Sequence, residues 1–174
     1  MSILKVDTIN EKTSGNGVAI PGHVIQVKQT VVSNVFSTTV GSGFAEMTDF
    51  RTAITPTSTT SKILVKGSLF VGQQYYQAKG RILRDSTAIA IGDARGVRPR
   101  STWMTLGYDA GAGNAYTPYR CSSVAFDFLD SPATTSATTY TVGLFVHNNF
   151  FLNRFAGGNN AGGSSYISLQ EIAQ

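Results

Sequence analysis

Charged residues are scarce in this 174-residue chain, and cysteine and histidine are scarcer still. Asp, Glu, Lys and Arg make up 14% of the sequence, against about 25% in an ordinary soluble domain. The single cysteine, Cys121, excludes an intrachain disulfide, and with only His23 and His147 beside it a Cys/His zinc site lacks a ligand set. We therefore expect no metal ion and no cofactor, and a fold stabilised by packing or by assembly.

Long apolar runs are also missing. No segment approaches the about 18 uninterrupted apolar residues that a bilayer crossing needs, and the N-terminus lacks the layout of a signal peptide. We expect a protein made in the cytoplasm, with no membrane insertion. The net charge of +4 comes from scattered residues, and only residues 79–100 are visibly basic. A groove for nucleic acid usually needs a stronger bias, so nucleic acid is not an expected partner.

The motifs of common enzymes are absent as well. There is no G-x-S-x-G turn, and Ser122 and Asp127 would share one strand instead of forming a triad with His147. The Gly-rich stretch at residues 107–113 is followed by no Lys-Ser/Thr pair, so it is not a phosphate-binding loop. Cys121 follows Arg120, but a small buried residue is a better interpretation than an activated thiol. We expect no catalytic residues and no enzymatic activity.

Neutral polar residues and glycine are abundant instead. The chain holds 17 Ser, 20 Thr and 18 Gly, and threonine and β-branched residues favour strands while glycine favours turns. In the first predicted strand, Ile25, Val27 and Val31 share the face that we expect to be buried. Alternation of apolar and polar residues predicts strands at residues 24–32, 63–71, 80–91 (a hairpin), 124–128, 139–146 and 165–172.

These strands predict an all-β protein, an antiparallel β-sandwich or jelly roll, formed by residues 23–174. Residues 1–22 differ, because a short apolar segment, a Gly-rich turn and a brief strand end at Pro21-Gly22. Such a piece buries too little surface to fold alone, so we expect an extended arm that lies on the main domain or is completed by a neighbouring chain. Its predicted docking contacts are Ile3, Val6, Ile9, Val18 and Ile20.

The segment from residue 92 to 118 is longer than the irregular connections of compact domains. It is either a functional surface loop or contains an irregular strand near residues 101–106. Aromatic rings and arginines in and around it suit recognition of a glycan or a protein, but in a trimer the same rings would pack between chains. Both alternatives stay open for the candidate contacts, which are Tyr75, Tyr76, Arg95, Arg98, Arg100, Trp103, Tyr108 and Tyr116.

Four parts of the sequence resemble one group of bacteriophage virion proteins, many of them from cyanophages and other marine phages. Residues 2–9 (SILKVDTI) and 20–27 (IPGHVIQV) are similar to the opening of those proteins. Residues 54–65 (ITPTSTTSKILV) resemble the entry to their central strand, residues 129–142 (LDSPATTSATTYTV) their penultimate hairpin, and residues 167–173 (ISLQEIA) their last strand. The resemblance implies a non-enzymatic virion structural protein, tail-fibre-like, with a jelly-roll head similar in plan to trimeric fibre knobs.

The leading hypothesis is a homotrimeric, surface-exposed tail fibre or fibre-like protein, assembled in the host cytoplasm and located on the virion. The arm would dock on other virion proteins, and the head would adhere to a glycan or protein of the host surface. The chain has no long shaft or coiled-coil heptads, which favours an alternative, a capsid decoration protein or head fibre on the shell. A third hypothesis is a free carbohydrate-binding lectin.

Overall fold

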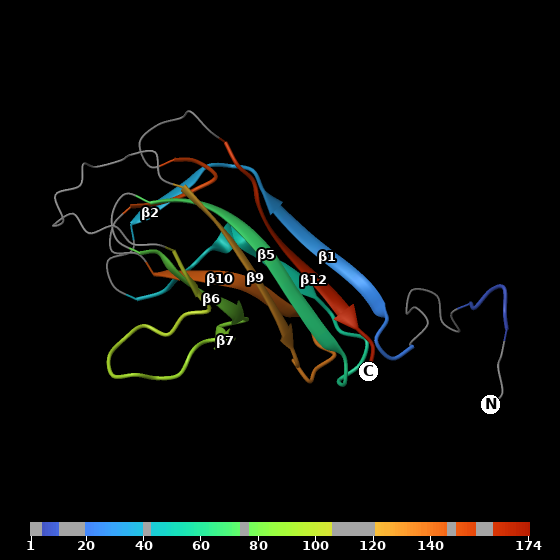
Figure 1. Cartoon of the computed structure of the whole chain (residues 1–174). Helices are drawn as coiled ribbons and strands as arrows, with labels where there is room; N and C mark the ends of the chain where they lie inside the picture. Colours follow the sequence, from blue (N-terminus) through green and yellow to red (C-terminus); the bar gives the residue numbers. More distant parts are fainter. Residues whose placement is uncertain are drawn as a thin grey trace.

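The computed structural model describes residues 5–10, 20–39, 43–73, 77–105, 121–145, 149–155 and 162–174. Two six-stranded sheets, A and B, face each other in a curved sandwich (Figure 1), and every strand pair in them is antiparallel. Among the described residues the one helical element is a turn of 3-10 helix, η1 (Thr48–Phe50). The predicted all-β antiparallel sandwich, of jelly-roll-like shape, is confirmed.

Sheet A is organised around its longest strand, β5. Its six strands are β1 (Val24–Val32), β2 (Phe36–Thr39), β5 (Lys62–Gln73), β9 (Cys121–Asp130), β11 (Asn149–Leu152) and β12 (Ser165–Ile172). One side of β5 pairs with β9 along almost its whole length, and the other side pairs first with β12 and then with β11. Strand β1 pairs with β12 and forms one edge of the sheet.

Sheet B is smaller and centred on β10 and β6. Its strands are β3 (Ala45–Glu46), β4 (Thr52–Ile54), β6 (Lys79–Arg84), β7 (Thr87–Ile89), β8 (Trp103–Met104) and β10 (Thr138–Phe145). The predicted hairpin at residues 80–91 is β6–β7, and the irregular strand considered near residues 101–106 is β8. The predicted strands at 24–32 and 165–172 have the observed bounds of β1 and β12, whereas β2 and β11 were not predicted.

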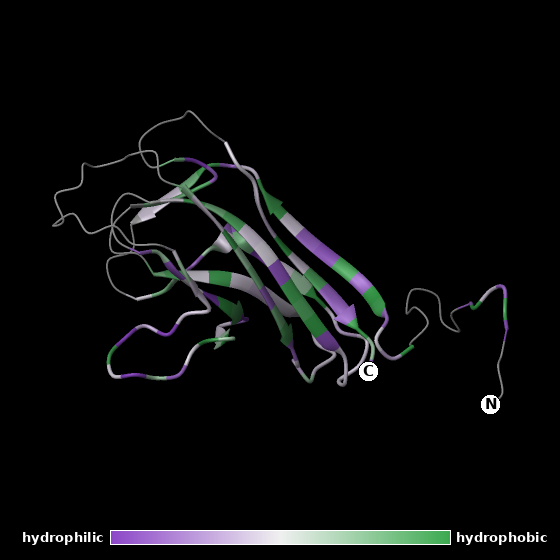
Figure 2. Ribbon diagram, in the orientation of Figure 1, coloured by the Kyte–Doolittle hydropathy of each residue, from purple (hydrophilic) through white to green (hydrophobic). Residues whose placement is uncertain are grey.

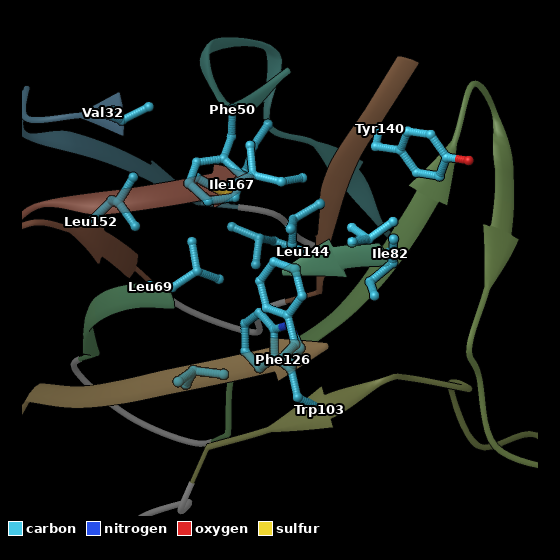
Figure 3. Close-up of a cluster of buried hydrophobic side chains, with 14 of the residues drawn as sticks. Val32, Phe50, Leu69, Ile82, Trp103, Phe126, Tyr140, Leu144, Leu152 and Ile167 are labelled. Atoms are coloured by element: carbon cyan, nitrogen blue, oxygen red, sulfur yellow. The ribbon is translucent and has the colours of Figure 1, made fainter. Parts of the chain in front are cut away.

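The core lies between the two sheets and draws on nearly every strand. On β5 the side chains of Ile63, Val65, Leu69 and Val71 share the inward face and are fully buried. Figure 3 shows side chains from both sheets meeting in this space, among them Phe126 of β9 in sheet A and Trp103 of β8 in sheet B. The core therefore consists of side chains from strands that are far apart in the sequence.

The outward face of β1 is opposite to the predicted one at Val27 and Val31, whereas Ile25 is half-buried. Figure 2 shows apolar and polar residues alternating along this strand. We expected Val27 and Val31 to face the core, but their side chains are 56% and 59% exposed. The register with β12 shifts between Val24 and Gln26, and a one-residue shift exchanges the two faces of a strand.

Hydrogen bonds of the inward polar residues explain this orientation. Gln26 Nε2 donates to the backbone oxygen of Thr55 at 2.8 Å. The Thr30 hydroxyl donates to the backbone oxygen of Arg51 at 2.9 Å and accepts a bond from the Thr52 hydroxyl at 2.8 Å. Strand β1 of sheet A and strand β4 of sheet B are thus joined at the sandwich edge by side chains, which requires the polar face of β1 to point inward.

A buried carboxylate lies at the same edge. Glu171 of β12 has no exposed surface, and it accepts hydrogen bonds from Gln26 Nε2 at 2.6 Å and from the Thr57 backbone and hydroxyl at 2.7 Å each. Burial acts to raise the pKa of Glu171, but the hydrogen bonds outweigh it and hold the pKa below its usual value. The ionised form of Glu171 therefore joins β1, β12 and the segment that follows β4.

Asn153 holds the opposite end of sheet A. It is fully buried with a positive φ of 63°, which asparagine tolerates better than most residues. Its Nδ2 donates to the backbone oxygens of Val32 and Asn34 at 2.7 and 3.0 Å, and its Oδ1 accepts a bond from the Ser165 hydroxyl at 2.7 Å. Its backbone N–H donates to Phe70 O at 2.8 Å. One side chain and its backbone therefore bind residues of β1, β5 and β12.

We expect Glu171→Gln to lower the free energy of unfolding by about 2 kcal/mol at neutral pH, because charge-assisted bonds to a buried group are replaced by weaker ones. The folded pKa is below the unfolded one, so the contribution of Glu171 is present above the unfolded pKa and is lost as the pH falls through the folded pKa. Urea unfolding at several pH values measures both effects.

The control is Glu46→Gln. The pKa of Glu46 is also lowered, by its hydrogen bond to Arg51, but the pair is exposed, so the substitution should change stability much less. Equal losses for the two variants would contradict the structural role assigned to Glu171.

Candidate interaction surfaces

The described part of the N-terminal arm is exposed throughout. Val6 and Ile9 are 51% and 57% exposed, and Ile20 is also exposed. The predicted contacts Ile3 and Val18 lie outside the described residues. None of the described arm residues belongs to the core cluster, so the core of the sandwich is complete without them.

The arm joins the sandwich at the edge of sheet A. His23 N donates to Ile20 O at 2.9 Å, Gly22 N donates to Ala173 O at 2.8 Å, and Ala173 N donates to His23 O at 2.9 Å. Gly22 has a φ of 86°, a conformation that favours glycine. The chain therefore enters β1 beside the last residues of the sequence, and Figure 1 shows the start of β1 and the C-terminus on the same side of the molecule.

An arginine-rich loop projects on the other side of the molecule (Figure 1). We call residues 92–101 the Arg loop. Arg98 N donates to Arg95 O at 3.4 Å across its tip, and Arg100 Nε donates to Gly92 O at 2.6 Å across its base. All three arginines are exposed, and Val97 at the tip is fully exposed. These bonds give the loop a defined form that presents cationic side chains around an apolar tip.

The base of the Arg loop is fixed by the residues that follow it. Thr102 N donates to Gly80 O at 2.7 Å, and the Thr102 hydroxyl accepts a bond from Ile82 N at 3.1 Å. Trp103 is only 9% exposed and packs in the core. Sequence reasoning placed Trp103 among the candidate receptor or interchain contacts, but the structure gives it a packing role under the Arg loop. Gly80 makes room for it, because a Cβ there would lie 2.0 Å from indole Cζ2.

The structure brings together three of the predicted contact residues. Arg95, Arg98 and Arg100 lie in one loop. The predicted aromatic contacts Tyr75, Tyr76, Tyr108 and Tyr116 lie outside the described residues.

The outer face of sheet A carries residues that the sequence analysis did not select. Its exposed apolar side chains on β1 are Val24, Val27 and Val31, which we call the valine stripe. Val31 is the register partner of Tyr166 on β12, so the stripe continues onto an aromatic ring that is 38% exposed. Beyond Tyr166, over β5 and β9, lies a hollow of about 230 Å³. It is lined by Lys66, Gly67, Ala125, Phe126, Asp127 and Tyr166.

The outer face of sheet B differs, because its cations contact aromatic rings. The Arg81 guanidinium lies 4.0 Å from the centroid of the Phe44 ring, and Lys79 Nζ lies 5.4 Å from that of Phe145. The two rings are 5.6 Å apart. Burial lowers the pKa of Arg81, although arginine remains charged at any ordinary pH. These cations therefore stabilise a compact surface cluster.

Reactive groups are few in the part of the chain that the structure describes. Cys121 is half-buried, and burial raises the pKa of its thiol, the opposite of what an activated nucleophile needs. In the same residues, no three His, Cys, Asp or Glu side chains gather where they could hold one metal ion. No described helix has the length and apolar character to span a membrane.

Comparison with known proteins adds no relative. No protein-family model matches the chain, and no curated protein matches it in sequence.

We expect Gly80→Ala to destabilise the protein by about 2 kcal/mol, because the added methyl group overlaps the indole of Trp103 in a packed core. Trp103 is the single tryptophan, so its emission reports directly on this site. Gly92→Ala is the matched control, since a Cβ there meets nothing within 4 Å. Thermal unfolding followed by fluorescence compares the two variants. Unchanged emission and stability in Gly80→Ala would contradict the observed packing.

Proposed function

We propose that the protein is a non-enzymatic structural subunit of a bacteriophage particle that forms a trimer, docks by its N-terminal arm and presents its head for adhesion to the host surface. The observation that carries the proposal is the valine stripe. A strand at the edge of a sheet is open to pairing with another chain, and proteins that remain monomeric usually protect such strands with charge. Strand β1 is an edge strand with one exposed lysine, Lys28, and it turns Val24, Val27 and Val31 outward.

The composition supports coverage of this surface by other chains. Only 14% of the residues are charged, and the outward face of β1 exposes three valines with the polar Gln29 between Val27 and Val31. A surface rich in apolar side chains is a common feature of interaction sites. The inward face of β1 is already committed to side-chain bonds with β4 and Glu171. The outward face is therefore the one on which a second copy would lie, and trimeric assembly is the symmetry implied by the resemblance to fibre knobs.

The arm suits attachment to a different partner. Its described residues are exposed and belong to no strand, and Val6, Ile9 and Ile20 present apolar side chains. A segment of this kind binds by adding a strand to the sheet of a partner, where backbone hydrogen bonds give affinity and side chains give register. The partner in this proposal is another virion protein, of the tail or of the capsid.

The position of the Arg loop supports a display role for the head. The residues where the arm joins the sandwich, 20–23, and the Arg loop lie on opposite sides of the molecule (Figure 1), so attachment through one leaves the other accessible. Arginine combines charge, planar hydrogen bonding and stacking, which makes it common in recognition surfaces. Arg95 and Arg98 at the tip are the side chains that we assign to contact with the host surface.

Replacing two valines of the stripe tests the assembly. We expect Val27→Lys/Val31→Lys to leave the sandwich folded, because both side chains point outward, and to convert the trimer into monomers by placing charges in the contact. Leu129→Lys is the control, since Leu129 is exposed on β9 at the other edge of sheet A. Native mass spectrometry measures the outcome. A monomeric wild-type protein, or a double variant that keeps the wild-type mass, would refute the assembly.

Deleting residues 1–19 tests the arm. The deletion keeps the turn between Ile20 and His23 and the bonds to Ala173, so the head should fold and retain its oligomeric state. We expect the truncated protein to be absent from purified phage particles, while the full chain is present. Incorporation at the normal level would exclude the arm as the attachment. Labelling of the full chain on particles then distinguishes a tail location from the alternative, a decoration protein on the shell.

A further inference from the structure

The hollow on the outer face of sheet A contains three polar side chains that have no partner within the described residues. Lys66 on β5 and Asp127 on β9 are direct register partners on neighbouring antiparallel strands. Opposite charges so placed often pair, yet the ion pairs of the described chain are Arg51–Glu46 and Arg84–Asp130. The Tyr166 hydroxyl, on β12, is not bonded in the described chain either. These groups are available to a ligand.

The shape of the hollow follows from small residues between larger ones. Ala125 occupies the outward position next to Asp127, and its register partner on β5 is Ser68. Tyr166 pairs with Ser68 from the other side, so the phenol ring and the two charged side chains surround a space where side chains are short. All of these positions lie on paired strands, and sites built on strands hold their geometry better than sites on loops.

The chemistry of the lining restricts the ligand. A carboxylate only accepts hydrogen bonds, an ammonium only donates them, and a phenol does both. A ligand that is purely anionic would face Asp127, and a purely cationic one would face Lys66. A neutral molecule with adjacent hydroxyl groups satisfies both, since each hydroxyl donates and accepts. The exposed face of the Tyr166 ring adds an apolar contact for the C–H groups of such a molecule.

We propose that this hollow binds one neutral sugar residue of a glycan, with Asp127 accepting bonds from adjacent hydroxyls, Lys66 donating to a hydroxyl or ring oxygen, and Tyr166 packing on the ring. The volume of the hollow is about 230 Å³. Sites for drug-sized ligands have volumes of about 300 Å³ or more, so this hollow suits a single sugar ring. The inference rests on the proposed function, because it names the ligand class and a second adhesive site beside the Arg loop.

The proposed sugar site is tested by adding simple glycosides to the wild type and to a variant whose side chain fills the hollow. Methyl glycosides of glucose, galactose, mannose and N-acetylglucosamine are titrated into the intact protein, and amide shifts are followed by ¹H–¹⁵N NMR. We expect at least one glycoside to shift amides around Ala125 and Tyr166, and Ala125→Leu to abolish the effect. Ser123→Leu is the matched control, because Ser123 lies on the same strand and the same face, one position outside the lining, and is also exposed. It should bind normally.

Substitutions of the polar groups test their roles. Asp127→Asn keeps the shape of the side chain but weakens its acceptor, and we expect it to reduce affinity for the glycoside about tenfold. Tyr166→Ala removes the ring contact and should also weaken binding. Thermal unfolding of each variant verifies the fold. Binding of no glycoside by the wild type, equal binding by Ala125→Leu and Ser123→Leu, or a response to free amino acids in place of sugars would overturn the proposal.

The outcome is independent of the assembly and docking tests. If the protein binds a glycoside but is not incorporated into particles, the hollow is still a sugar site, whether or not the protein is a trimer. If incorporation depends on the arm but the hollow binds no glycoside, the proposed virion role stands and the proposed sugar site is refuted.

Discussion

The hydrogen bonds between β1 and β4 determine much of the surface of this protein. At this edge the two sheets approach each other but share no backbone pairing in the described strands, and Gln26 and Thr30 supply the connection instead. Because these polar side chains must point inward, Val27 and Val31, which directly follow them in the strand, must point outward. The same polar residues lead to Glu171, whose ionised carboxylate is satisfied only while β1, β12 and Thr57 are in place. Stability at this edge and the exposure of the valine stripe therefore have one cause.

Sheet A also separates the surfaces that we assign to different partners. Its β1 edge carries the valine stripe and receives the arm, whereas the hollow lies over β5 and β9, on the far side of Tyr166. The Arg loop extends from sheet B and is anchored by Trp103 and Thr102. Contacts between copies, attachment to a particle and recognition of a host surface can thus use different parts of a small molecule, with Tyr166 at the border between the valine stripe and the hollow. The rigid paired strands keep these parts at fixed positions relative to one another.

Most of the fold could be predicted from local patterns, and most of the surface chemistry could not. Alternation predicted the bounds of β1 and β12. The same rule was wrong for β1, since the partners of Gln26 and Thr30 are brought to it by tertiary structure. Trp103 was predicted as a receptor or interchain contact, because the space that Gly80 provides for its indole lies on another strand and is not visible in the local sequence. Lys66 and Asp127 lie opposite each other because of the register between β5 and β9, and no local sequence pattern specifies that register.

Asn153 has a consequence for how the chain folds. Its side-chain partners Val32, Asn34 and Ser165 lie 121, 119 and 12 positions away in the sequence. A fully buried amide in a left-handed conformation gains its bonds only after the first, middle and last strands of sheet A have met in the correct order. Before that point the same group opposes compaction, because an unsatisfied polar side chain is costly to bury. Asn153 therefore disfavours misaligned sheets, and folding of the sandwich should be slow and highly cooperative, as expected for contacts this distant in sequence.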